Sequence, residues 1–326
     1  MRRGPRRIIY CRPSGRRAAH KTGEHSMTVL DRRMNRRNIV LNYGQGDVEQ
    51  SRARLIVDQT HPFFFDHPLD HVPGLLLLEG AVQAAQNSAT FPCFVAAIRA
   101  QFVKYAYFER PIHVIWKSPD EDKGQQRCHV EIMQDHTLCA RITVDLRPET
   151  GLARAGQLSG QPAASGLKNG GMCAASVGRD AACDGGPLNK LRAENVLITT
   201  PHLGTEHVTA QLLPMADTCL FGDGFDVVHP LYLLEAFMQV QRYLNATQDG
   251  DKRIRDILTG VSIDLSRPLA SLTNVTLHGT RVFQSDNRGR LWRGATLQAD
   301  GQAFAQCSIE TARLTRARKS RTSKRD

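Results

Sequence analysis

One segment of the chain is apolar on almost every side of a helix. Residues 75–85 contain a run of four leucines, and their only polar side chains are Glu79 and Gln83. A helix without a polar face has no side for solvent and must be enclosed by protein. The second half has a corresponding helix, which carries Glu235 and Gln239. The pattern therefore predicts one buried helix in each half.

Alternating apolar and polar residues predict strands on both sides of each helix. In the first half the expected strands are 39–42, 52–57, 94–105, 112–117, 127–133 and 140–146. In the second half they are 196–199, 207–212, 259–262, 275–283, 292–299 and 306–310. A single buried helix with antiparallel strands predicts a sheet wrapped around that helix. This is the hotdog architecture, of the α+β class.

The two halves repeat one pattern at a displacement of about 156 residues. Residues 76–79 align with 232–235, and Gln83 aligns with Gln239. Two further anchors keep the same order and spacing, and they pair 37–41 with 194–198 and 108–111 with 265–268. We therefore expect a tandem hotdog whose two domains pack as a covalent pseudo-dimer, with further homo-oligomers left open.

The positive charge of the chain is concentrated at its two ends. The net charge is +11, yet residues 1–37 hold twelve Lys/Arg and two acids, and residues 313–326 hold seven Lys/Arg and one acid. Blocks of like charge are typical of disordered tails. Binding of these tails to RNA or to a membrane surface is an alternative, as is a start at Met27 or Met34.

The composition of the central part predicts two domains and a linker. Residues 147–187 are rich in Gly, Ala and Ser, which is typical of a flexible connection. We expect hotdog domains at 38–146 and 188–312 on either side of it. Because the charge between the tails is mildly acidic, we do not expect nucleic acid as the partner of these domains.

The apolar residues and cysteines exclude several classes of protein. No apolar run approaches the roughly 18 to 20 residues of a membrane helix, so we expect no membrane span. The eight cysteines form no CxxC pair, and no secretion signal accompanies them. We therefore expect reduced thiols in a cytoplasmic protein, with neither a metal nor a cofactor.

A loop rich in His and Asp, residues 61–74, leads into the first helix. Pro73 suits a first helical turn, and Gly74 lets a substrate carbonyl approach the free N–H groups there. Those groups and the helix dipole would stabilise an oxyanion at a thioester carbonyl. His67 and His71 have side chains whose pKa suits proton transfer near neutral pH. We expect His61, beside a run of phenylalanines, to be a core histidine.

The acids of the two helices are candidates for catalysis. Glu79 and Gln83 are four residues apart and share one helix face. A carboxylate buried there without partners would cost several kcal/mol, so it is either paired structurally or used chemically. Asp70 is a candidate substrate-binding residue, with local turn formation as its alternative.

The segment His67-Pro68-Leu69-Asp70-His71-Val72-Pro73-Gly74-Leu75-Leu76-Leu77-Leu78-Glu79 resembles DHVPGMLLLEAARQA of the A-factor biosynthesis (γ-butyrolactone synthase) hotdog family. Residues 102–111 resemble the next block of that family, and residues 229–235 resemble its more degenerate repeat. The spacing of Pro73, Gly74, Glu79 and Gln83 is also similar to the PGxxxxEAxxQ helix entry of β-hydroxyacyl-ACP dehydratases. In those enzymes a loop histidine of one domain faces a helix acid of the other.

The resemblance to such pseudo-dimers implies how the two copies share their sites. Position by position, His67 becomes Asp223 and Gly74 becomes Pro230. Likewise His71 becomes Val227 and Pro73 becomes His229. We therefore expect one main active site, which combines His67 and Gly74 with Glu235. The other would pair Asp223 with Glu79, and Gln83 and Gln239 are expected to bind substrate.

The resemblance implies an acyltransferase of secondary metabolism and quorum sensing. Members of the family transfer a β-ketoacyl group from acyl carrier protein to dihydroxyacetone phosphate, towards γ-butyrolactone signals. The arginine of the family helix is replaced by Val82 and Met238, which leaves the hydroxyl acceptor open. The alternatives are a hotdog dehydratase or thioesterase acting on acyl-ACP or acyl-CoA, and a non-catalytic acyl-binding regulatory protein.

Overall fold

The computed structural model describes residues 35–44, 51–117, 120–122, 124–149, 178–216, 227–247, 254–285 and 290–315. Almost all of the two predicted basic tails and most of the predicted linker lie outside these ranges. Asp223, the loop residue expected to face Glu79, also lies outside them.

All described strands belong to one antiparallel sheet. The first half contributes β1 (Leu41–Asn42), β2 (Arg52–Leu55), β3 (Cys93–Phe102), β4 (Ile112–Trp116), β5 (Asp120–Asp122), β6 (Gln125–Gln134) and β7 (Thr137–Pro148). The second half contributes β8 (His202–Leu203), β9 (His207–Gln211), β10 (Ile254–Leu265), β11 (Val275–Thr280), β12 (Gln284–Ser285), β13 (Leu291–Ala299) and β14 (Gln302–Thr315). The order is β1-β2-β4-β6-β7-β3-β10-β14-β13-β11-β9-β8, with β5 beside β6 and β12 beside β13.

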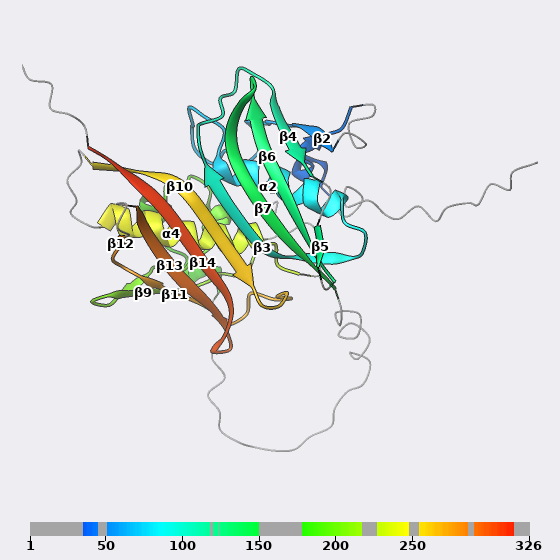
Figure 1. Ribbon diagram of the computed structural model, residues 1–326. Helices are drawn as coiled ribbons and strands as arrows, with labels where there is room; N and C mark the ends of the chain where they lie inside the picture. Colours follow the sequence, from blue (N-terminus) through cyan, green and yellow to red (C-terminus); the bar gives the residue numbers. More distant parts are fainter. Residues whose placement is uncertain are drawn as a thin grey trace, which may run out of the picture.

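The two halves meet where β3 pairs with β10. The pairing is antiparallel and places Ile98 opposite Ile263 and Ala100 opposite Val261. Each half therefore continues the sheet of the other, and the sheet runs through the whole molecule (Figure 1). The predicted tandem hotdog, with its pseudo-dimeric packing, is confirmed.

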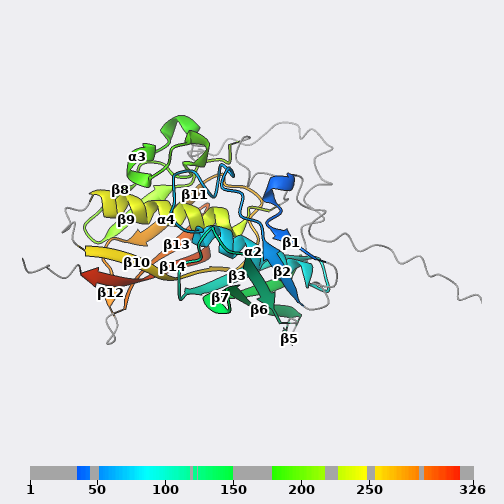
Figure 2. The same ribbon diagram turned by 90° about the horizontal axis from the view of Figure 1, so that it is seen from above.

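Each half encloses one long helix. Helix α2 (Gly74–Asn87) and helix α4 (Pro230–Thr247) lie on the same side of the sheet and contact each other (Figure 2). Residues 76–85 of α2 are all buried, as the apolar pattern predicted. The packing is tight at Gly80, where a Cβ atom would lie 2.7 Å from Leu55 Cδ1. None of the described helices has the length and apolar character needed to cross a bilayer.

Several predicted strands differ in extent from the observed ones, as those at 94–105 and 196–199 show. The strand predicted at 94–105 ends at Phe102, because residues 103–107 leave the sheet and Ala106 O accepts a hydrogen bond from Val72 N. The segment predicted as a strand at 196–199 follows the 3-10 helix Ala193–Asn195 and forms only two isolated bridges, at Ile198 and Thr199.

A short segment before the second domain packs against α4. It contains the 3-10 helix Arg179–Ala181 and the four-residue helix α3 (Gly185–Leu188). Asn189 ends α3 in the left-handed conformation, with φ of 55°. Gly185 lies so close to the next turn that a Cβ atom there would be 2.5 Å from Lys190 O. This turn directs Lys190 into the interior, where its side chain is 4% exposed.

Candidate active site

Each central helix carries a glutamine whose side chain hydrogen-bonds to backbone groups of a segment earlier in the same half. Gln83 Oε1 accepts a hydrogen bond from Val40 N (3.0 Å), and Gln83 Nε2 donates to Asn38 O (2.6 Å). The same Nε2 donates to Glu79 Oε1 at 2.7 Å. The amide therefore holds both the backbone and the carboxylate of its own helix in place.

The second helix repeats this arrangement. Gln239 Oε1 accepts from Leu197 N (2.9 Å), and Gln239 Nε2 donates to Asn195 O (2.7 Å). Its contact with Glu235 Oε1 is longer, at 3.4 Å. Because both amides bond to backbone groups in this way, the geometry favours a positioning role for Gln83 and Gln239. The binding of substrate by either one stays a prediction.

Glu79 is paired with a histidine of the other half. His229 Nε2 lies 3.2 Å from Glu79 Oε2, and both side chains are at most 3% exposed. His229 Nδ1 accepts a hydrogen bond from Leu231 N at 3.2 Å, so the neutral ring carries its proton on Nε2, towards Glu79. The two halves thus share an acid–imidazole pair, at a position where the sequence analysis expected Asp223 to face Glu79. Its histidine is His229, at the position aligned with Pro73.

The same histidine closes the N-terminus of α4. Pro230 has no N–H, and His229 accepts from the N–H of Leu231 through its ring and from that of Tyr232 through its carbonyl. The cavity beside His229 and Pro230 measures only about 30 Å³. The start of α4 therefore offers little room or hydrogen-bonding capacity to a ligand.

Glu235 sits in a different setting, between two cations. Lys190 Nζ lies 3.0 Å and Arg242 Nη1 lies 2.6 Å from Glu235 Oε1. Burial alone would raise the pKa of Glu235, but the charges and hydrogen bonds of Arg242 and Lys190 outweigh it and lower the pKa to about 2. Glu235 is therefore a permanent anion near neutral pH, and it holds both cations.

His67 belongs to this cluster. Its pKa is lowered by burial and by the charges of Arg242 and Lys190, against the opposing charges of Asp66 and Glu235. The ring is therefore neutral at pH 7. Its Nδ1 is buried, and no group in the described part of the chain hydrogen-bonds to it. The charges of Glu235, Lys190 and Arg242 all act on His67. A shared catalytic role for His67 and Glu235 stays a prediction.

The N-terminus of α2 opens on an apolar pocket. Its N-cap, Pro73, makes no side-chain hydrogen bond, and the first N–H groups of a helix have no partner within it. The pocket measures about 340 Å³ and is bordered by Gly74, Leu77, Phe102 and Ile257. A Cβ atom on Gly74 would lie 3.1 Å from Phe102 Cζ, so glycine keeps this end clear.

His71 stands at the rim of the same pocket. Its Nδ1 lies 2.6 Å from Asp70 Oδ1, and its ring packs at a tilt against Tyr105 with centroids 4.3 Å apart. The Asp70 side chain is 94% exposed. Asp70 therefore orients His71 from the solvent side, which leaves the predicted binding of substrate by Asp70 untested. His61 is buried and neutral, with its pKa lowered to about 4 mainly by burial.

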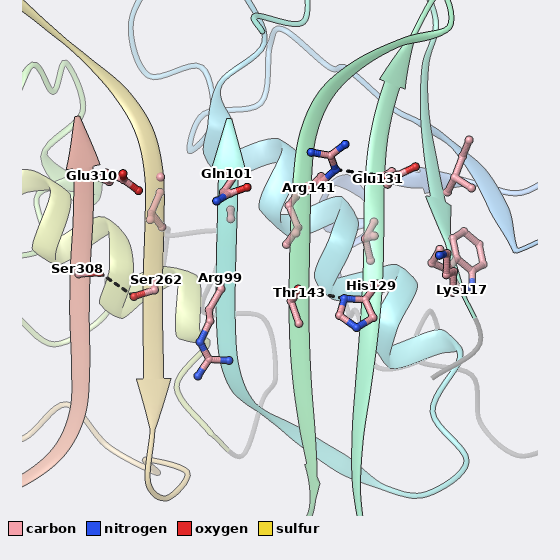
Figure 3. A pocket seen from close by; sticks show the side chains of 17 residues that line it. Arg99, Gln101, Lys117, His129, Glu131, Arg141, Thr143, Ser262, Ser308 and Glu310 are labelled. Carbon is pink, nitrogen blue, oxygen red and sulfur yellow. Dashed lines mark hydrogen bonds and ion pairs between the residues drawn. The ribbon is translucent and has the colours of Figure 1, made fainter. Parts of the chain in front are cut away.

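A larger hollow of about 700 Å³ lies elsewhere, on the face of the sheet turned away from α2 and α4 (Figure 3). Its walls mix apolar side chains with polar ones, which include Arg99, His129, Arg141 and Glu310. No residue predicted as catalytic or substrate-binding lines it. Among the described residues, no group of three or more His, Cys, Asp or Glu side chains could hold a metal ion.

The first half is similar to a known protein family. Residues 32–149 match the A-factor biosynthesis hotdog domain. The resemblance to this family is therefore confirmed over that stretch.

Similar curated proteins are named 2-oxo-3-(phosphooxy)propyl 3-oxoalkanoate synthase. That of Streptomyces virginiae is 41% identical over 86 residues, 26% of this chain and 29% of the relative. That of Streptomyces coelicolor is 48% identical over 64 residues, 19% of this chain and 20% of the relative. The chain thus matches less than a third of either relative.

Solved structures show the fold of the whole molecule. A conserved hot dog fold protein from Alicyclobacillus acidocaldarius matches with a TM-score of 0.52 and 8% identity, covering 89% of this chain and 99% of that one. The tesB protein of Mycobacterium avium subs paratuberculosis matches with a TM-score of 0.50 and 11% identity, covering 84% and 96%. At these identities the likeness shows a double hotdog and carries no information on activity.

Sequence reasoning missed three residues of these clusters. His229 was visible as a histidine directly before a buried helix, in the place of the first helix's Pro73. Arg242 lies seven residues after Glu235, on a nearby helix face, and this spacing could have indicated the ion pair. Lys190 gave no signal, because a lysine near the end of a Gly-rich segment is ordinarily exposed.

Proposed function

We propose that this chain is an acyltransferase that moves a β-ketoacyl group from a carrier-protein thioester to a hydroxyl group of a small acceptor. One observation carries the proposal. The N–H groups at the start of α2 face an apolar pocket of about 340 Å³, whereas the start of α4 is closed by His229. Among the described residues, the start of α2 is therefore the position with room for an acyl thioester.

The start of α2 is the oxyanion site in this proposal. The thioester carbonyl oxygen accepts hydrogen bonds from the N–H groups of Gly74 and Leu75, and the acyl chain enters the apolar pocket. Negative charge that develops on this oxygen is stabilised by the N–H groups and by the helix dipole. The absence of a side chain at Gly74 allows the close approach.

His67 is the base. It is neutral at pH 7 because burial and two nearby cations lower its pKa, so its ring nitrogen is able to take a proton. It removes the proton of the acceptor hydroxyl as the oxygen attacks the thioester carbon. The tetrahedral intermediate then collapses, the C–S bond breaks, and the imidazolium returns the proton to the leaving thiolate. The products are an ester and a free thiol.

The remaining residues position these groups. Glu235 holds Lys190 and Arg242 beside His67, and their charges keep the imidazole neutral. The Glu79–His229 pair joins the two halves and closes the second position. His71 borders the pocket mouth, where it contacts the thioester arm. We place the reaction in the cytoplasm, and the five cysteines of the described part are buried free thiols.

The proposal is supported by the curated relatives, which are named as synthases of a phosphorylated 3-oxoalkanoate ester. Their names describe the product of acyl transfer to a phosphorylated hydroxyketone, which is the reaction class that the site accommodates. The test is to incubate the purified chain with β-ketoacyl carrier protein and dihydroxyacetone phosphate, and to determine the product mass. A β-ketoacyl ester is expected.

The His67→Gln variant should lose ester formation, while His129→Gln, a change on the outer face of the sheet, should retain it. A free acid would instead identify a thioesterase, and an enoyl thioester would identify a dehydratase. Either product, without ester, overturns the proposal. So does full ester formation by the His67→Gln variant.

A further inference from the structure

Strand β10 of the second half carries a β-bulge where it borders the pocket at the start of α2. Leu258 pairs with Thr311 of β14, and Gly260 pairs with Glu310, so Thr259 is the extra residue between them. A bulge inserts one residue into a strand and re-aims its side chain, and bulges are over-represented next to active sites. Thr259 is one of the residues that line the pocket.

The pairing of β10 with β3 places Thr259 near the start of α2. The two strands pair as far as Gly260 and Gln101, and the next positions along them are Thr259 and Phe102. Opposite residues of two antiparallel strands have Cβ atoms about 4.5–5.5 Å apart. Phe102 in turn lies against the helix start, because its Cζ would be 3.1 Å from a Cβ atom on Gly74. Thr259 therefore lies in the part of the pocket next to the first N–H groups of α2.

The hydroxyl group of Thr259 is an unused donor in an apolar wall. Among the described residues that line the pocket, the other polar side chains are those of His71, Lys104 and Tyr105. Lys104 is exposed, and Tyr105 is 47% exposed. No group in the described part of the chain hydrogen-bonds to the Thr259 side chain. A hydroxyl has one O–H donor, and here it is available to a ligand.

A β-ketoacyl chain needs a donor at this place. Its keto carbon is two bonds beyond the thioester carbon. When the thioester oxygen lies on the N–H of Gly74, the keto oxygen is therefore held close to the start of α2. A carbonyl that leaves water for an apolar pocket loses free energy unless a hydrogen bond replaces those it made in the solvent. A saturated acyl chain has no keto oxygen and carries no such cost.

We propose that Thr259 selects β-ketoacyl chains by donating a hydrogen bond from its hydroxyl group to the keto oxygen. Thr259 is a specificity-determining residue in this scheme, and it takes no part in proton transfer. The inference rests on the proposed function, because the acyl chain occupies the same pocket at the start of α2. It adds the residue that recognises the second carbonyl of the donor.

The test compares two unreactive probes that differ by one oxygen. Both are pantetheine analogues in which N–H replaces the sulfur, one with a 3-oxooctanoyl chain and the other with an octanoyl chain. Binding of each is measured by calorimetry on the full chain without acceptor, so the measurement does not depend on turnover. We expect the wild type to bind the 3-oxooctanoyl probe about three- to tenfold more tightly, because one hydrogen bond distinguishes the two.

Three variants connect this preference to the hydroxyl group. Thr259→Val keeps the branched shape and removes the donor, so the octanoyl probe should bind it at least as tightly as the 3-oxooctanoyl probe. Thr259→Ser keeps the donor and should keep the preference. The matched control is Thr143→Val, which removes a hydroxyl that contacts His129 on the outer face of the sheet. This control should show the full preference of the wild type.

Equal binding of the two probes by the wild type would overturn the inference, even if Thr259→Val failed to fold. So would a Thr259→Val variant that keeps the preference, since another group would then recognise the keto oxygen. The proposed function fails separately. If the preference depends on Thr259 and no ester forms with any acceptor, the keto-binding site stands and the acyl-transfer assignment is lost. If neither probe binds the wild type, both are wrong.

Discussion

Replacing Gly74 by proline removes the N–H group that the account places on the thioester oxyanion. Proline at the first position of a helix loses no intrahelical hydrogen bond, and its fixed φ suits that position. The second half of this chain already carries Pro230 there, at the start of α4. Pro73, which would precede the new proline, is in an extended conformation with ψ of 137°, as a residue before proline requires.

The size of the effect follows from the geometry. Loss of one oxyanion donor costs about 10²–10³-fold in kcat, or roughly 2.7–4 kcal/mol. The steric part can be separated with Gly74→Ala, which keeps the N–H and adds only a Cβ atom, 3.1 Å from Phe102 Cζ. The Phe102 ring is partly buried and needs to move by only a few tenths of an ångström. We therefore expect Gly74→Ala to lose about tenfold at most.

The assay is the initial rate of ester formation with saturating acceptor, together with the melting temperature of each variant. Gly74→Pro should fold, because proline restricts the unfolded chain and its position tolerates the ring. Equal losses in Gly74→Pro and Gly74→Ala would refute the reasoning, since the added bulk and not the missing N–H would then explain both. Full activity in Gly74→Pro would refute it as well.

Three further predictions concern ionisable groups in the interior. Glu235→Gln leaves Lys190 and Arg242 without their anion and should lower the free energy of unfolding in urea by about 3 kcal/mol, whereas Glu131→Gln, an exposed pair with Arg141, should cost under about 1 kcal/mol. Since the pKa of His67 is lowered from 6.5, ester formation should be constant above pH 6.5 and decline only as the pH falls below it; a decline that begins above pH 7 would contradict the assignment of His67 as the base. The pKa of His61 is about 4 in the folded state and 6.5 in the unfolded state, so the unfolded chain binds more protons between these pH values. The free energy of unfolding therefore decreases as the pH falls through this window. Between pH 7 and pH 5 the decrease should be about 2 kcal/mol in the wild type and smaller in His61→Asn.

The buried helices and their acids could be predicted because the signal is local. A segment that is apolar all round has to be enclosed, and an acid within it has to be buried. The repeat then placed Glu235 and Gln239 at the same helical positions as Glu79 and Gln83. The sheet around each helix followed from the strand pattern of its own half. These elements depend only on residues close together in the chain.

The partners of the acids could not be predicted in the same way. His229 reaches Glu79 because α2 and α4 contact each other across the pseudo-dimer. How far one helix is displaced along the other depends on the packing of both halves, and no local sequence pattern indicates it. Lys190 reaches Glu235 because a turn built on Gly185 and Asn189 directs it inward. The alignment paired His67 with Glu235, and it gave no indication of the two cations that help to lower the pKa of His67.

The central claim is that the start of α2 is the one acyl-binding position in the chain. A crystal structure with a non-hydrolysable β-ketoacyl pantetheine analogue tests it most directly. We expect one analogue per chain, with its carbonyl oxygen within hydrogen-bond distance of Gly74 N and its acyl chain beside Leu77 and Phe102. An analogue bound at His229 and the start of α4, or in the hollow on the outer face of the sheet, would contradict it.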